Sequence, residues 1–155
     1  MRLRIFFFEG SFMAEKNYID IEDFYTDDNE KNGLWHEGMV DGEPSGLVFQ
    51  MIGIHSDEAV AKMEHYDRLT KELREKEKDP QIRAAKEREL DAERVASLTK
   101  GLKCADGRGI RKDGKEVDFS IDLVKEIFLH SPLLKMDCIE FSIKTANFMN
   151  RKKNR

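Results

Sequence analysis

The sequence has few of the residues that build small ligand sites, and it has no long apolar run. Its 155 residues include only two cysteines, Cys104 and Cys138, together with three prolines and one tryptophan. Neither cysteine has a second cysteine or a histidine at the short spacing of a zinc site. This predicts free thiols in a reducing cytoplasm, with Cys138 as a small core residue. No apolar stretch is long enough to span a bilayer, so we expect a cytoplasmic protein without a membrane partner.

An excess of positive charge is also absent. Charged residues make up 37% of the chain and hydrophobic residues 39%, and the formal net charge is −4. A surface that neutralises phosphates must be cationic, so this balance disfavours general nucleic-acid binding. The exception is the basic tail, residues 151–155, for which capping of a helix end is the simpler interpretation. A small regulator that binds nucleic acid through this tail remains a third hypothesis for function.

No arrangement of residues predicts catalysis or a cofactor. The Asp-Gly pairs at 41–42, 106–107 and 113–114 lack the alternating oxygen ligands and the final glutamate of a calcium loop, so we expect turns there. No serine or cysteine has the sequence context of an activated nucleophile. The four histidines show no metal-binding pair at i,i+4; they are His36, His55, His65 and His130. We therefore expect no catalytic residue, no metal, no cofactor and no enzymatic activity.

The first residues loosely resemble a signal peptide. Residues 1–8 carry two arginines and then an apolar run, but Glu9-Gly10 interrupts the run and no cleavage site follows. Met13 begins a segment typical of an ordinary cytoplasmic start. We expect residues 1–16 to be an extension and Met13 to be the native start.

Residues 17–78 predict a β-hairpin followed by a helix. Residues 34–40 and 47–54 are strand-like and flank six turn-forming residues, 41–46. A lone hairpin is marginally stable in water, so the acidic arm of residues 17–32 or the next helix should cover it. We expect this arm to be a short strand or extended segment that ends in a polar turn over residues 27–33. That helix starts at Ser56, which precedes two carboxylates, and its apolar stripe should pack on the hairpin.

A charged helix is predicted over residues 79–103. Asp79 is its expected cap, Pro80 occupies the first helical position, and a weak apolar stripe continues to Leu102. Because no strict heptad continues through Pro80, the pattern favours a solvated helical hairpin or kinked arm over a long coiled coil.

Residues 104–150 predict a loop and two short helices. The loop covers residues 104–115, and residues 116–119 form at most a very short strand. Ser120 caps the first helix, and Ser131-Pro132 opens the second. The whole pattern predicts an α+β, mainly helical fold: an N-terminal β-hairpin packed on helices, a charged helical middle and a C-terminal pair of short helices.

Five aromatic residues are candidates for partner binding. Core packing is the default interpretation of such residues, and anchoring of a partner is the alternative. The five are Trp35, Phe49, Phe119, Phe141 and Phe148.

The order of these segments resembles the small tail assembly chaperones of long-tailed bacteriophages. The resemblance rests on the Asp113-Gly114 turn before Phe119-Ser120, on Ser131-Pro132 and on the closing residues 146–148, and it covers about residues 33–150. The family implies a non-enzymatic protein in the host cytoplasm that binds the tape-measure protein while tail-tube subunits polymerise around it. It also implies a tendency to form homo-oligomers. A structural role in the virion, as a minor tail or head–tail connector component, is the main alternative.

Overall fold

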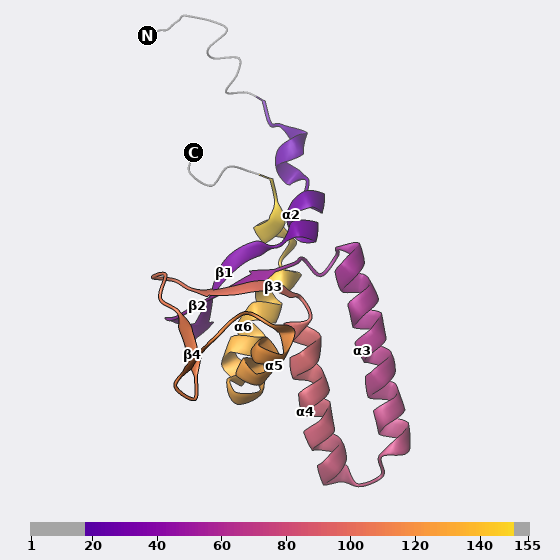
Figure 1. Ribbon diagram of the computed structural model, residues 1–155. Helices are drawn as coiled ribbons and strands as arrows, with labels where there is room; N and C mark the ends of the chain where they lie inside the picture. The colour runs from indigo at the N-terminus through magenta and orange to yellow at the C-terminus, as the bar shows by residue number, and fades with distance from the viewer. Residues whose placement is uncertain (1–17, 151–155) are drawn as a thin grey trace, which may run out of the picture. The chain divides into compact units, whose positions relative to one another are not determined.

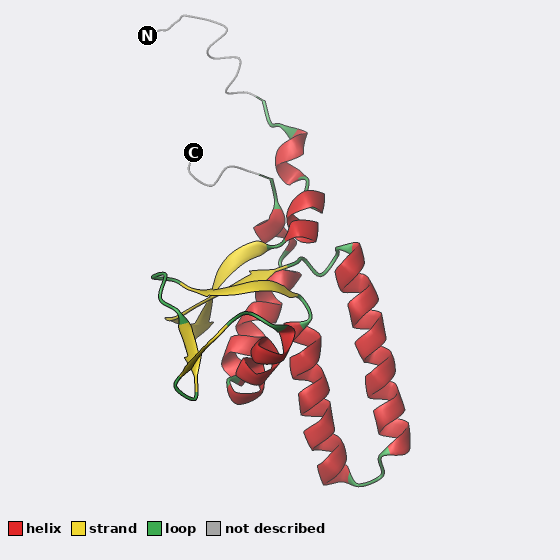
Figure 2. Cartoon of the chain, in the orientation of Figure 1, coloured by secondary structure: helices red, strands yellow, loops and turns green. Residues whose placement is uncertain are grey.

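The computed structural model describes residues 18–150, which belong to two compact units. The larger unit, Thr26–Met149, contains both sheets and the long helices. In the smaller unit the described residues are 18–25 and Asn150, and they include a short 3-10 helix, η1 (Ile21–Phe24). The predictions about residues 1–16 and the basic tail 151–155 lie outside the described residues. The predicted α+β, mainly helical fold is confirmed (Figure 2).

A three-stranded antiparallel sheet forms the centre of the larger unit (Figure 1). Strand β2 (Glu43–Met51) lies between β1 (Leu34–Val40) and β3 (Thr99–Cys104). The predicted hairpin of β1 and β2 is therefore confirmed, but the predicted six-residue connection is wrong. Asp41 and Gly42 alone form the turn, with φ of 52° and 79°. Two left-handed residues are what a two-residue type I′ turn requires, and they match the twist of the strands.

Pro44 explains why the turn was expected to be longer, because proline normally argues against a strand. In the structure Pro44 pairs with Met39, beside a register shift in β1. The Met39 N–H donates to the Asp137 carboxylate, 2.9 Å away, instead of to β2. The Met39 N–H thus points away from β2, so Met39 and Pro44 form a non-hydrogen-bonded pair of the ladder. At such a position β1 needs no hydrogen bond from the N–H group that proline lacks.

The third strand comes from a segment predicted to be helical. Helix α4 (Pro80–Ala96) ends before Ser97, and β3 pairs Leu102 with Phe49 and Gly101 with Gln50. The prediction of a helix over residues 79–103 is therefore wrong after Ala96. The strand that pairs with the hairpin is β3, and it comes from neither of the two segments expected to cover the hairpin, the acidic arm and the next helix. Residues 27–32 of that arm, predicted as a turn, instead form helix α2 (Asp27–Asn32).

Helices α5 (Ile121–His130) and α6 (Pro132–Ile143) pack against the sheet, α6 on β1 and β2 and α5 on β3. Ser120 caps α5 as predicted, since its side chain accepts the Leu123 N–H. Pro132 opens α6 as predicted, although the Ser131 side chain makes no capping hydrogen bond. We call the sheet with α5 and α6 the body. The buried apolar core joins the body to Ala59, near the start of the first long helix, and to the end of α4. The core residues are Phe49, Met51, Ile52, Ala59, Ala92, Val95, Ala96, Leu98, Val124, Phe128, Leu134 and Cys138.

Helices α3 (Asp57–Lys76) and α4 form an antiparallel helical hairpin, the arm, which extends away from the body (Figure 1). Both predicted caps are confirmed: Ser56 accepts the Ala59 N–H, and Asp79 accepts the N–H groups of the first turn of α4. The helical hairpin is the arrangement that the sequence favoured. The expectation that α3 packs on the β-hairpin is wrong, because α3 packs along α4.

Two smaller features complete the larger unit. Strands β4 (Ile110–Lys112) and β5 (Lys115–Val117) form a second hairpin, whose Asp113-Gly114 turn has the same φ values as the first turn, 52° and 79°. Strand β4 lies inside the predicted loop, whereas β5 overlaps the very short strand expected over residues 116–119. The 3-10 helix η2 (Thr145–Phe148) contacts α2, where the Asn29 side chain donates to the Phe148 carbonyl.

Candidate partner-binding surfaces

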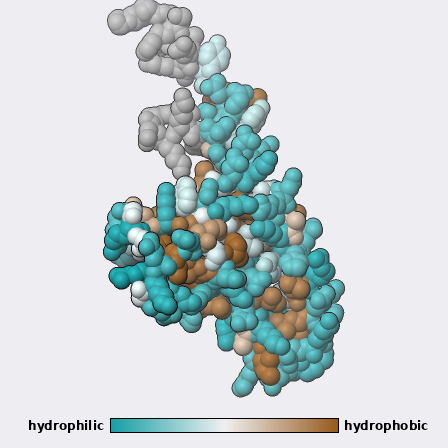
Figure 3. Space-filling model, viewed as in Figure 1, coloured by the Kyte–Doolittle hydropathy of each residue, from teal (hydrophilic) through white to brown (hydrophobic). Residues whose placement is uncertain are grey.

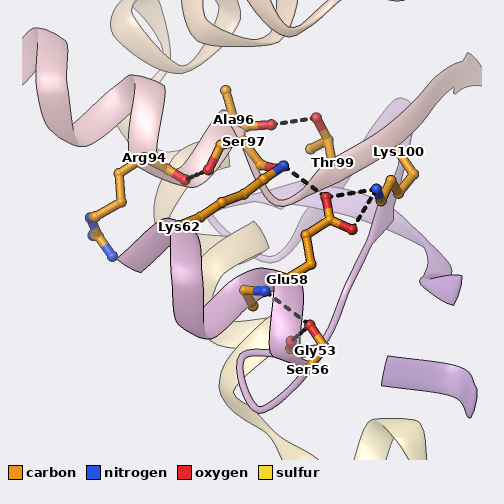
Figure 4. Close-up of polar contacts among 10 residues, drawn as sticks. Gly53, Ser56, Glu58, Lys62, Arg94, Ala96, Ser97, Thr99 and Lys100 are labelled. Atoms are coloured by element: carbon orange, nitrogen blue, oxygen red, sulfur yellow. Dashed lines mark hydrogen bonds and ion pairs between the residues drawn. The ribbon is translucent and has the colours of Figure 1, made fainter. Parts of the chain in front are cut away.

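The base of the arm is held to the sheet by polar contacts around Glu58 (Figure 4). The Glu58 carboxylate accepts from Lys100 of β3 at 2.7 Å and forms an ion pair with Lys62 at 2.8 Å. Lys62 also donates to the Ser97 carbonyl at the end of α4. Hydrogen bonds from Lys100 and Lys62 lower the pKa of Glu58. The start of α3, the end of α4 and the start of β3 are therefore joined by charged groups.

Asp91 joins α4 to α6. Its carboxylate accepts hydrogen bonds from Lys135 of α6 and from Arg94 of its own helix, the latter at 2.6 Å. Burial raises the pKa of Asp91, but the hydrogen bonds from the two cations outweigh it and leave the pKa below the ordinary value of 3.8. The folded state therefore favours the ionised carboxylate.

Glu93 joins α4 to α3 and α5. It accepts from the Tyr66 hydroxyl at 2.8 Å and from Lys125 of α5 at 3.2 Å. Burial and the Glu93 carboxylate raise the pKa of Tyr66 to about 12. For Glu93 itself, burial raises the pKa, but the hydrogen bonds outweigh that and the pKa is lowered. The proximal half of the arm is thus fastened to the body.

The distal half of the arm, residues 67–90, has no such support. None of these residues is buried, and Ile82 is 47% exposed. A groove of about 740 Å³ runs along it, lined mainly by charged side chains of both signs. Figure 3 shows hydrophobic residues between the two helices, flanked by hydrophilic ones. This half is a charged surface without a core of its own.

Helix α6 is apolar on two faces. Leu134 and Cys138 are buried on its inner face, whereas Leu133, Met136 and Ile143 are 44%, 51% and 52% exposed on the opposite face. We call these three exposed residues the α6 ridge. Sequence reasoning missed the ridge, because it considered only aromatic residues as candidates for partner binding. The available signal was that apolar residues occur around the whole circumference, which in a short surface helix predicts a second covered face.

The five aromatic candidates have different positions. Trp35 and Phe119 are exposed, at 44% and 37%. Phe49 and Phe148 are fully buried and are core residues, with Phe49 packed against Phe128. Phe141 is half-buried and contacts Phe148 edge-on, with ring centroids 5.4 Å apart. The structure brings only Phe141 and Phe148 together, so the five do not form one anchor set.

Trp35 lies on the face of the sheet opposite α6. Its ring extends across the neighbouring strand, because a Cβ added to Gly101 of β3 would come within 2.7 Å of Trp35 Cη2. Lys103 Nζ lies 4.1 Å from the ring centroid in a cation–π contact. Trp35 therefore lies across the sheet beside Gly101 and Lys103, and its side chain remains 44% exposed.

One carboxylate–imidazole pair lies beside α6. His36 Nε2 is 2.7 Å from Asp137 Oδ2, and Phe141 stacks on the imidazole with centroids 4.3 Å apart. The same carboxylate oxygen accepts the Met39 N–H. The adjoining hollow of about 280 Å³ is lined by no serine, threonine or cysteine among the described residues. These contacts position α6 against the edge strand β1.

Within residues 18–150, no group of three or more His, Cys, Asp or Glu side chains is placed to hold a metal ion. In the same part of the chain, no helix has the length and apolar character needed to cross a membrane. Comparisons with protein-family models, curated proteins and solved structures found no match to this chain. The candidate surfaces are therefore assigned only from the burial and contacts of their residues.

Proposed function

We propose that this protein is a non-catalytic protein-binding factor, a tail assembly chaperone that binds the tape-measure protein through the α6 ridge. The observation that carries the proposal is the second apolar face of α6. Leu133 and Met136 are one helical turn apart, and Ile143 continues the same face two turns later. Side chains at this spacing pack against the apolar stripe of another helix.

The energetic reason for binding is burial of these half-exposed side chains. Each would remove apolar surface from water at about 25 cal/mol per Å². Glu140 lies among them and is exposed, so the ridge has a polar group that keeps it soluble when no partner is bound. A surface of this kind suits a partner that is held and later released.

The resemblance to tail assembly chaperones supports the same helix. Ser131-Pro132 opens α6 and residues 146–148 follow it, so two of the segments that resemble the family frame the ridge. The family's partner, a long helical protein with apolar stripes, has the chemistry that the ridge would bind.

The test is co-expression with the tape-measure protein encoded by the same genome, measuring its soluble fraction and co-purification. We expect the wild-type protein to raise both, and Met136→Glu to abolish the effect because it places a charge on the ridge. Val60→Glu is the matched control, since Val60 is 45% exposed on α3 and lies outside the ridge. No gain in solubility with the wild-type protein would refute the proposal.

Mass spectrometry of mature virions separates the chaperone from a structural component. A chaperone is absent from purified particles. Stoichiometric retention would instead assign the protein to the tail or the head–tail connector.

A further inference from the structure

The described part of the smaller unit has many exposed apolar side chains. None of residues 18–25 is buried. Twelve large apolar residues are exposed within residues 18–150, and five of them lie in this short segment. The five are Tyr18, Ile19, Ile21, Phe24 and Tyr25, with exposures of 74%, 78%, 64%, 53% and 53%. Single apolar residues on a surface need no explanation, but a concentration of them marks an interaction site.

The composition of residues 18–25 also differs from that of a plain linker. Segments that stay disordered have few aromatic and β-branched residues, because they have little apolar surface to bury. All five apolar residues of this segment are aromatic or β-branched. Its only regular element is the 3-10 helix η1, and one such turn is marginal without packing. The segment therefore lacks a surface against which a longer helix would be stable.

Most of the apolar side chains share one face when the segment is α-helical. At about 100° per residue, four of them fall within one arc of about 120°. These four are Tyr18, Ile21, Phe24 and Tyr25, and Ile19 lies outside the arc. Asp20 and Glu22 border the arc, one on each side. The sequence thus encodes an amphipathic helix whose apolar face is flanked by carboxylates.

The charge of the segment determines which partner it can bind. Residues 17–30 contain six carboxylates and no lysine or arginine. This charge repels the phosphates of nucleic acids and anionic lipids. It attracts a cationic protein surface and disfavours an acidic one.

We infer that residues 18–25 are a recognition segment that becomes an α-helix against an amphipathic helix of another protein, one whose apolar stripe is flanked by lysine or arginine residues. The apolar face of the segment packs on that stripe, and Asp20 and Glu22 lie beside the cations of the partner. The partner supplies the packing that the single turn lacks. Because eight residues bury less than a standard interface and become ordered on binding, we expect a dissociation constant of about 10–100 μM.

An NMR titration of the isotopically labelled full chain with a synthetic helical peptide tests the inference. The probe is about 20 residues long, with leucines at i, i+3, i+4 and i+7 and lysines elsewhere. A second peptide has glutamates in place of the lysines. We expect the leucine–lysine peptide to shift the amide signals of residues 18–25 and to move their Cα shifts toward helical values. The leucine–glutamate peptide should bind at least tenfold more weakly.

One pair of variants tests the apolar contribution. Ile21→Ser/Tyr25→Ser should weaken binding of the leucine–lysine peptide at least tenfold. The matched control is Val60→Ser/Ile82→Ser, which removes two exposed apolar side chains from α3 and α4 and should leave the affinity unchanged. All four residues are exposed, and unchanged amide signals of the larger unit check that each variant is folded.

A second pair of variants tests the charge. Asp20→Lys/Glu22→Lys should weaken binding of the leucine–lysine peptide at least tenfold and strengthen binding of the leucine–glutamate peptide. The matched control is Asp67→Lys/Glu72→Lys, which makes the same change in charge at exposed carboxylates of α3. It should leave the preference between the two peptides unchanged.

Several outcomes would overturn the inference: no binding at about 1 mM peptide, equal affinity for the two peptides, or shifts confined to the larger unit. Preferential binding of phosphatidylglycerol vesicles by residues 18–25 would assign the segment to a membrane and would also overturn it. Shifts of these residues that depend on protein concentration without peptide would assign it to a second copy, with the same consequence. The inference does not rest on the proposed function, since Met136→Glu should leave the peptide-induced shifts of residues 18–25 unchanged.

Discussion

Replacing Gly101 by alanine should displace the tryptophan that lies across it. A Cβ at this position would be 2.7 Å from Trp35 Cη2 and 3.1 Å from Gln50 Oε1, and both distances are too short. The backbone of Gly101 is not in the left-handed region, so alanine itself fits the strand. The conflict is therefore between the new methyl group and the side chains above it, and the indole ring has to move.

The expected change in the free energy of unfolding combines three contributions. Displacement of the ring loses the cation–π contact with Lys103, about 0.5–1 kcal/mol for an exposed pair. Re-exposing about 40 Å² of ring and sheet costs about 1 kcal/mol more. Alanine in place of glycine returns about 0.4–1 kcal/mol, because it restricts the unfolded chain. Gly101→Ala should thus destabilise the protein by about 1 kcal/mol.

A double-mutant cycle with Trp35→Ala isolates the contact. When the indole is absent, only the effect of alanine on the unfolded chain remains, so Gly101→Ala should stabilise by about 0.4–1 kcal/mol. The coupling between the two positions should be about 1.5–2 kcal/mol. Urea unfolding followed by circular dichroism measures all four proteins.

Fluorescence gives a second measurement, because Trp35 is the only tryptophan of the chain. Its emission should shift to longer wavelength in Gly101→Ala as the ring enters water. If Gly101→Ala is equally destabilising with and without the indole, or if the emission does not change, the described position of Trp35 is refuted.

Three further predictions concern the turn, the α4 carboxylates and the thiols. Gly42→Ala should destabilise the protein by about 1–2 kcal/mol in thermal unfolding, because φ of 79° is unfavourable for a residue with a Cβ; an unchanged midpoint would contradict this turn. The folded-state pKa values of Asp91 and Glu93 are lowered from the ordinary values of 3.8 and 4.5. The two ionised carboxylates therefore stabilise the folded state fully at a pH above the ordinary values, and this stabilisation is lost as the pH falls through the lowered folded-state values. Urea midpoints between pH 7 and pH 3 should fall less for Asp91→Asn than for wild type, and equal slopes would argue against the Asp91 contacts. Cys138 is fully buried and burial raises its thiol pKa, whereas Cys104 is half-buried, so a maleimide should label Cys104 alone until the protein unfolds, as read by mass spectrometry.

Local chemistry in the sequence predicted the helix starts. Ser56, Asp79 and Ser120 each precede a helix and satisfy its free N–H groups within three residues, so the signal and its structural effect lie in the same short segment. The Asp41-Gly42 turn carried an equally local signal. Pro44 obscured it, because proline normally argues against a strand, and only the pairing of Pro44 with Met39 shows that β2 includes it.

The third strand and the site depend on distant residues. Leu98 and Leu102 have helical spacing, and only the pairing of Leu102 with Phe49 makes this segment a strand. The same limit applies to the aromatic candidates, since the chemistry of Phe49 suits a core as well as an interface. For α6, the sequence shows an apolar helix but not which arc of it meets the sheet. The α6 ridge can be identified only from the structure, in which β1 and β2 cover the inner face of α6 and leave the opposite face exposed.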